Sequence, residues 1–167
     1  MSQPSLNLQP CALSDLGELH YRFARSRLPQ SQLQLLVVAL EGAAGNEADE
    51  IFDLASAIVM AGLEAWQPWA AILDFRGLAY SWGDRMQNVL LAPQRWYEPL
   101  WPVRKAFGGE RVPEQFPFAV LTSELNREGL VSLLRDEMNL DPRRFLFETP
   151  DAAARVLDES LEGVTEP

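Results

Sequence analysis

The stretch Trp-Ala-Ala-Ile-Leu-Asp-Phe at residues 69–75 decides the fold, because its nearly unbroken apolar run is typical of a strand buried on both faces. A strand buried in this way belongs inside a parallel sheet whose faces are covered by helices. A second apolar run of strand length lies at residues 33–40, and residues 48–66 between the two repeat apolar side chains at helical spacing. This order predicts two parallel strands joined by a crossover helix.

The same alternation continues toward the C-terminus. A helix beginning near Met86 is expected to stop at Pro93, because proline lacks the N–H that a helix interior needs. Residues 118–121 then predict a strand, followed by a helix with Ser123 as its N-cap and Asn139 at its end. A short strand at residues 145–147 precedes a last helix, for which Thr149 and Pro150 supply the N-cap and the first turn.

On the N-terminal side, residues 19–25 alternate apolar and polar side chains, which predicts an antiparallel edge strand with one buried face. We therefore expect one α/β domain over residues 11–162, with a mixed sheet of about five strands and three or four packing helices. Residues 1–10 and 163–167 are expected to form a loose arm and tail. Residues 93–117, with five prolines and several aromatic residues, are expected to form an irregular or short-helical excursion.

The charge and the rare residue types limit the function. The 167 residues carry a net charge of -10, which disfavours nucleic acid and anionic membranes as partners and favours a protein with a basic surface. Cys11 and His20 are the single cysteine and histidine, so neither a disulfide within the chain nor a multi-histidine metal site is expected. Gly108 and Gly109 lack the lysine and hydroxyl of a phosphate-binding loop. We expect no catalytic residue, metal or cofactor.

The cellular location is expected to be the cytoplasm. Residues 1–10 lack the basic and apolar regions of a signal peptide. No apolar run approaches the roughly 20 residues that a membrane-spanning helix needs. A single cysteine also fits a reducing compartment.

Residues 72–80, Ile-Leu-Asp-Phe-Arg-Gly-Leu-Ala-Tyr, resemble the central stretch of STAS domains, the fold of bacterial anti-sigma factor antagonists. In that family a buried strand ends in an acidic residue, and a short turn and apolar step lead to the regulated helix. The order of elements over residues 19–162 is also similar, so the resemblance covers most of the chain. It implies a STAS-like fold and an interaction module that contacts its partner at this helix. Gly83 and Asp84 stand where regulated members carry a phosphorylated Ser or Thr, and Ser81 lies two positions earlier.

A cluster rich in Trp, Tyr and Arg follows the same strand and forms the candidate partner-binding surface. These residue types are enriched among interface hot spots, because each buries a large area and keeps a polar group. The alternative is that the rings cover the core beneath a long loop. The cluster consists of Tyr80, Trp82, Asp84, Arg85, Trp96, Tyr97 and Trp101.

Asp74 ends the buried strand, at the sheet edge where α/β proteins place ligand contacts. It is expected either to contribute an acidic group to a surface groove or to have a structural role. In the structural role it would accept from the amides of Gly83 or Asp84, or pair with Arg76 or Arg85.

These features predict a non-enzymatic protein-binding domain. Its acidic, single-domain character is similar to that of small bacterial immunity proteins, so direct neutralisation of a toxin is the main functional hypothesis. The alternative is a STAS-type regulator of a kinase or sigma-factor pathway. A small hydrolase would need a pocket with converging polar groups, and the sequence offers no such set.

Overall fold

The structure is a computed structural model that describes residues 19–44, 49–80 and 85–164. Five strands form one mixed sheet in the order β1-β2-β3-β4-β5. β1 pairs antiparallel with β2, and β2 to β5 are parallel to one another, which confirms the predicted sheet and its antiparallel edge. The strands are β1 (Leu19–Arg27), β2 (Gln34–Ala44), β3 (Ala70–Tyr80), β4 (Phe118–Leu121) and β5 (Leu146–Phe147).

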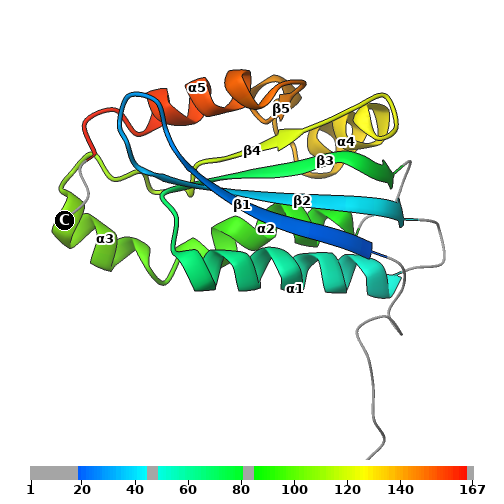
Figure 1. Cartoon of the computed structure of the whole chain (residues 1–167), viewed down its shortest axis with the longest axis horizontal. Coiled ribbons are helices and arrows are strands. Elements are labelled where there is room, and N and C mark those ends of the chain that lie inside the picture. The colour runs from blue at the N-terminus through cyan, green and yellow to red at the C-terminus, as the bar shows by residue number, and fades with distance from the viewer. Residues whose placement is uncertain (1–18, 45–48, 81–84, 165–167) are drawn as a thin grey trace, which may run out of the picture.

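Helices connect the parallel strands and cover the sheet. In Figure 1, α1 and α2 lie below the strands and α5 lies above them, so the domain has three layers. Five α-helices are present in the described residues, against the three or four expected, because residues 93–117 hold a helix of their own. They are α1 (Asp49–Trp66), α2 (Met86–Tyr97), α3 (Trp101–Gly108), α4 (Arg127–Ser132) and α5 (Pro150–Ser160). A π-helical turn, η2 (Leu133–Glu137), extends α4, and a 3-10 turn, η3 (Pro142–Arg144), precedes β5.

The core lies on both faces of β3. Residues 70–73 of β3 are at most 1% exposed, as a central parallel strand requires. On one face the helix α1 contributes Val59 and Leu63, both fully buried. On the other face α5 contributes Ala153 and Leu157. Burying one such leucine or valine stabilises the fold by about 1.5–3 kcal/mol, so this central strand holds the two helical layers together.

Pro93 does not end α2, contrary to the prediction. The helix continues through Pro93 to Tyr97, and Pro93, Trp96 and Tyr97 are all buried. A proline inside a helix costs about 3 kcal/mol, and burying two large aromatic side chains in the next turn can offset that cost. Tertiary packing therefore outweighs the local signal.

Ser123 is also not the cap of α4. Its hydroxyl donates to the carbonyl of Arg76 at 2.9 Å, and Asn126 takes the N-cap position. The predicted cap at Thr149 is present, because its side chain accepts from the backbone N–H of Ala152. Asn139 follows η2 with a positive φ of 53°, consistent with its predicted role at the end of that helix.

The burial of two residues near the ends of the described chain, Tyr21 and Val164, differs from the prediction. Tyr21, predicted to lie on the buried face of β1, is 47% exposed, because it is on an edge strand that α1 covers only in part. Phe23 from the same face is half-buried against Trp66, with ring centroids 4.8 Å apart. Val164, assigned by sequence to the loose tail, is 4% exposed. The predicted arm at residues 1–10 and Cys11 lie outside the described residues.

Candidate functional site

β3 extends beyond β4 and bends where it does so. The pairing of β3 with β4 ends at Asp74 and Leu121, whereas β3 continues to Tyr80. Its pairing with β2 shifts register over the same stretch, between the Asp74 and Gly77 pairs. Such an irregularity changes the direction of the strand and of its side chains. The carboxyl end of β3 therefore extends past β4 on one side, while on the other side it stays paired with β2 as far as Tyr80.

Asp74 pairs with Arg76 at this bend. The Arg76 side chain donates to the two carboxylate oxygens at 2.9 and 2.8 Å, and the Arg76 backbone N–H donates at 3.2 Å. Burial by itself would raise the pKa of Asp74, but the hydrogen bonds from Arg76 outweigh burial and hold the pKa below its ordinary value. Asp74 thus takes one of its predicted structural roles, in which its charge is already matched by an arginine.

Asn126 fixes the turn between β4 and α4 against the carboxyl end of β3. Its side-chain amide donates to the carbonyls of Phe75 and Leu78, the latter at 2.9 Å. Its side-chain oxygen accepts from the backbone N–H of Ser123 at 3.2 Å. Asn126 is 1% exposed, so these hydrogen bonds satisfy polar groups that water does not reach.

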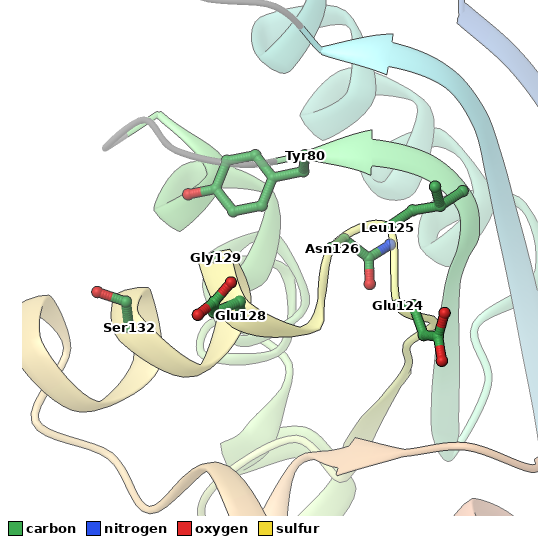
Figure 2. Close-up of a pocket in the computed structure, with 7 residues that line it drawn as sticks. All are labelled: Tyr80, Glu124, Leu125, Asn126, Glu128, Gly129 and Ser132. Carbon is green, nitrogen blue, oxygen red and sulfur yellow. The ribbon is translucent and has the colours of Figure 1, made fainter.

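The turn and the first residues of α4 form a shallow groove of about 250 Å³ beside the end of β3, which we call the acidic groove. Tyr80 forms one wall, and Figure 2 shows its ring lying over the first turns of α4, across from Glu128 and Ser132. The Tyr80 ring packs edge to face against the ring of Phe52, with 6.0 Å between the ring centroids. The remaining lining residues are Glu124, Leu125, Asn126 and Gly129.

The acidic groove combines two charges of one sign with an exposed apolar side chain. Glu124 and Glu128 are exposed, and Leu125, which follows Glu124 in the chain, is 61% exposed. The Ser132 hydroxyl donates to Asp136 at 2.9 Å and is thereby already engaged. The groove can therefore accept hydrogen bonds from a cationic group and cover an apolar one.

The described part of the chain brings together few groups that could react. No three His, Cys, Asp or Glu side chains among the described residues gather closely enough to hold a metal ion. His20 lies on the exposed edge strand β1, which is separated from β3 by β2. No helix in the described ranges is both long and apolar enough to cross a membrane.

The predicted aromatic surface is divided by the fold. Tyr80 borders the acidic groove but is only 2% exposed, so most of its ring belongs to the core. Arg85 is exposed and paired with Asp53 at 3.1 Å. Trp101 is partly buried beneath Lys105, whose ammonium lies 4.6 Å from its ring. Trp82 and Asp84 lie outside the described residues.

Trp96 and Tyr97 belong to the core, so the prediction that they lie on a binding surface is wrong. They are 4% and 1% exposed and both pack against Phe116. Trp96 donates to Glu64 at 2.9 Å, and the Tyr97 hydroxyl donates to the carbonyl of Pro113 at 2.8 Å. The physical reason is that α2 continues past Pro93 and carries both rings inward.

Sequence reasoning missed the residues of the turn after β4. Their signal was present, because Ser-Glu-Leu-Asn at residues 123–126 comes one residue after a predicted buried strand. Asn and Ser favour turns in which their side chains bind the backbone, and carboxyl ends of parallel strands often carry ligand contacts. Ser123 was predicted as the N-cap, so the sequence offered no separate reason to expect that Asn126 would begin α4 and bind β3.

Comparison with known proteins shows that the fold of this chain is similar to that of a solved structure. No family model matches the chain, and no curated protein matches its sequence. Among solved structures, the chain is similar to an anti-sigma factor antagonist from Mycobacterium paratuberculosis, with a TM-score of 0.48 and 14% identity. The match covers 84% of this chain and 94% of that chain.

Proposed function

We propose that this chain is a non-catalytic, STAS-type regulator that binds a protein partner through the acidic groove. The observation that carries the proposal is the exposed Leu125, which lines the groove together with Glu124 and Glu128 and lies on a turn that Asn126 ties to β3. An apolar side chain presented on a rigid turn loses little conformational freedom on binding, which favours affinity.

The groove indicates the chemistry of the partner. An apolar side chain flanked by Lys or Arg would cover Leu125 and reach the two carboxylates. The net charge of -10 would also attract a basic surface and speed encounter. Such contacts depend on salt, because exposed charges are screened.

Regulation is preferred to toxin neutralisation because two features of the chain favour it. Residues 72–80 resemble the central stretch of STAS domains, and the mixed five-stranded sheet has the order that this resemblance implies. The immunity hypothesis rests on acidity and small size alone. The proposal includes a cytoplasmic location, which the single cysteine fits.

The first experiment identifies the partner at the groove. A photocrosslinking amino acid is placed at Leu125 in the native cell, and a second variant carries it at Val103, an exposed position on α3. A protein crosslinked from position 125 and absent from position 103 is the expected result. Equal products from both positions would contradict a specific contact.

The second experiment measures binding of that purified protein by calorimetry. Leu125→Asp, and Glu124→Ala combined with Glu128→Ala, are each expected to weaken binding by about tenfold or more, which corresponds to about 1.4 kcal/mol. Glu98→Ala combined with Glu110→Ala changes the net charge equally at exposed positions outside the groove and is expected to change affinity by less than about twofold. A partner that proves to be a toxin domain inhibited by the chain would contradict the regulatory role.

A further inference from the structure

A second groove, of opposite charge, lies along the edge strand β5. The 3-10 turn η3 places Arg143 and Arg144 immediately before β5, which is the last strand of the sheet. The groove runs between β5, α5 and the loop that leads into β4, with a volume of about 460 Å³. We call it the arginine groove.

The floor of the arginine groove is apolar. Phe118 and Phe145 pack against each other with ring centroids 5.3 Å apart. Val156, on α5, is 39% exposed although it borders this apolar floor. The apolar lining consists of Phe116, Phe118, Phe145, Phe147, Val156 and Leu157.

The charges of the groove are both positive and have no acidic partner in the described residues. Arg143 and Arg144 are the two charged residues that line it, and both are exposed. Neither side chain forms an ion pair or hydrogen bond with another described residue. The nearby Asp141 accepts from the backbone N–H of Arg143 at 3.1 Å, so its carboxylate caps the turn.

The neighbouring arginines differ from this pair. Arg127 is paired with Glu148, and Arg135 with Asp136 at 2.9 Å. The chain as a whole has a net charge of -10, but the two exposed guanidinium groups of Arg143 and Arg144 make the charge beside this apolar floor locally positive. Arginine forms a planar fork that suits carboxylates, and such charge-assisted hydrogen bonds are among the stronger ones.

We infer that the arginine groove binds an acidic peptide segment of another protein, with an aromatic or leucine side chain on the phenylalanine floor and Asp or Glu on Arg143 and Arg144. This surface is separate from the acidic groove, which would take a basic partner. The chain would then hold two segments of opposite charge, one in the acidic groove beside α4 and one in the arginine groove beside β5.

Selection from a displayed library of random peptides tests the inference even though the natural partner is not identified. The immobilised full chain is expected to enrich peptides with two or more acidic residues and one aromatic residue or leucine. Fluorescence anisotropy then measures the affinity of one enriched peptide for the chain and its variants. Enrichment of basic or uncharged peptides, or no enrichment, would overturn the inference.

Matched variants separate the groove from general charge effects. Arg143→Glu combined with Arg144→Glu is expected to weaken binding at least about tenfold. Arg25→Glu combined with Arg95→Glu changes the net charge equally at exposed positions outside the groove and is expected to change affinity by less than about threefold. Equal losses in the two double variants would show that net charge alone attracts the peptide, and would overturn the inference.

Two further measurements check the floor and the class of ligand. Val156→Asp replaces a side chain that is already partly exposed, so the chain is expected to stay folded by circular dichroism while the peptide binds at least about fivefold more weakly. Unchanged binding would contradict a contact with the floor. Tighter binding of a single-stranded oligonucleotide than of the acidic peptide, lost on the same arginine substitutions, would assign the groove to nucleic acid instead.

Discussion

The side-chain amide of Asn126 donates a hydrogen bond of 2.9 Å to the carbonyl of Leu78. The same amide also donates to Phe75. Both carbonyls belong to the part of β3 that continues after β4 has ended. The Asn126 side chain therefore supplies hydrogen bonds that the backbone N–H groups of a longer β4 would otherwise supply. The acidic groove exists because this contact holds the start of α4 beside Tyr80.

Replacing Asn126 with Ala is expected to destabilise the fold by about 1–3 kcal/mol or more, because two buried carbonyls lose their donor. Asn126→Asp is expected to cost more, since a carboxylate cannot donate and would lie against both carbonyls. Urea unfolding followed by circular dichroism measures the difference. Asn88→Ala, at a half-buried position where the side chain accepts a hydrogen bond from exposed Arg95, is expected to change stability by less than about 0.5 kcal/mol. An equal loss in both variants would contradict the special role of Asn126.

Asp158 is expected to make stability depend on pH. It is 4% exposed and accepts from the backbone N–H groups of Gln30 and Ser31 at 2.6 and 2.9 Å. Burial alone would raise the pKa of Asp158, but the hydrogen bonds from Ser31 and Gln30 outweigh burial and lower it. The folded state therefore favours the ionised form, and the contribution is complete above the unfolded pKa of about 3.9 and declines as the pH falls toward the lower folded value.

Asp158→Asn tests this dependence. Unfolding free energies of the parent and the variant, measured by urea titration between about pH 7 and pH 3, should differ by a constant amount near neutrality and converge below about pH 4. Glu159→Gln, at the exposed next position of α5, is the control and should follow the parent. A difference that stays constant down to the lowest pH would show that ionisation of Asp158 is not responsible.

Arg104 anchors α3 to the body of the domain. Its guanidinium lies 4.7 Å from the centroid of Trp69, and it donates to the carbonyls of Pro68 and Gln67 at 2.9 and 3.0 Å. Arg104→Ala is expected to lower the free energy of unfolding by about 2–3 kcal/mol. Arg104→Lys is expected to lower it less, but not to restore it fully, because an ammonium group cannot reproduce the planar pair of donors that reaches both carbonyls.

Thermal unfolding measures both changes at Arg104. Lys105→Ala, which removes one exposed cation over Trp101, is expected to lower the melting temperature far less. Full stability of the lysine variant would mean that charge alone suffices at position 104.

Gly62 allows α1 to approach β1. A Cβ atom there would lie 2.6 Å from a ring atom of Phe23 and 3.3 Å from the side chain of Leu36. Gly62→Ala is expected to destabilise the parent by about 1 kcal/mol or more, because overpacking outweighs the gain in helix propensity.

The Phe23→Leu background should reverse that effect. With the ring removed, Gly62→Ala is expected to stabilise α1 by up to about 1 kcal/mol through helix propensity. A double-mutant cycle by urea unfolding measures the coupling between the two positions. If the effects of Gly62→Ala and Phe23→Leu are additive, the steric clash at position 62 is with Leu36 and not with Phe23.

Local sequence patterns were sufficient for the sheet. The apolar runs at residues 33–40 and 69–75 needed burial on both faces, and the helical spacing between them left a parallel crossover as the solution. The N-cap at Thr149 and the strand at Phe118–Leu121 were equally local signals, and both are present. Periodicity and capping act within a few residues, so the sequence alone determines them.

Only the tertiary structure decided where the aromatic residues and the groove lie. Pro93 indicated a helix end, yet burial of Trp96 and Tyr97 carries α2 past it and removes both rings from the surface. Asn126 reads as an ordinary turn residue until the bend in β3 brings the carbonyl of Leu78 to it, from 48 positions away in the chain. Such contacts depend on distances between elements far apart in sequence, and the packing of the whole domain sets those distances.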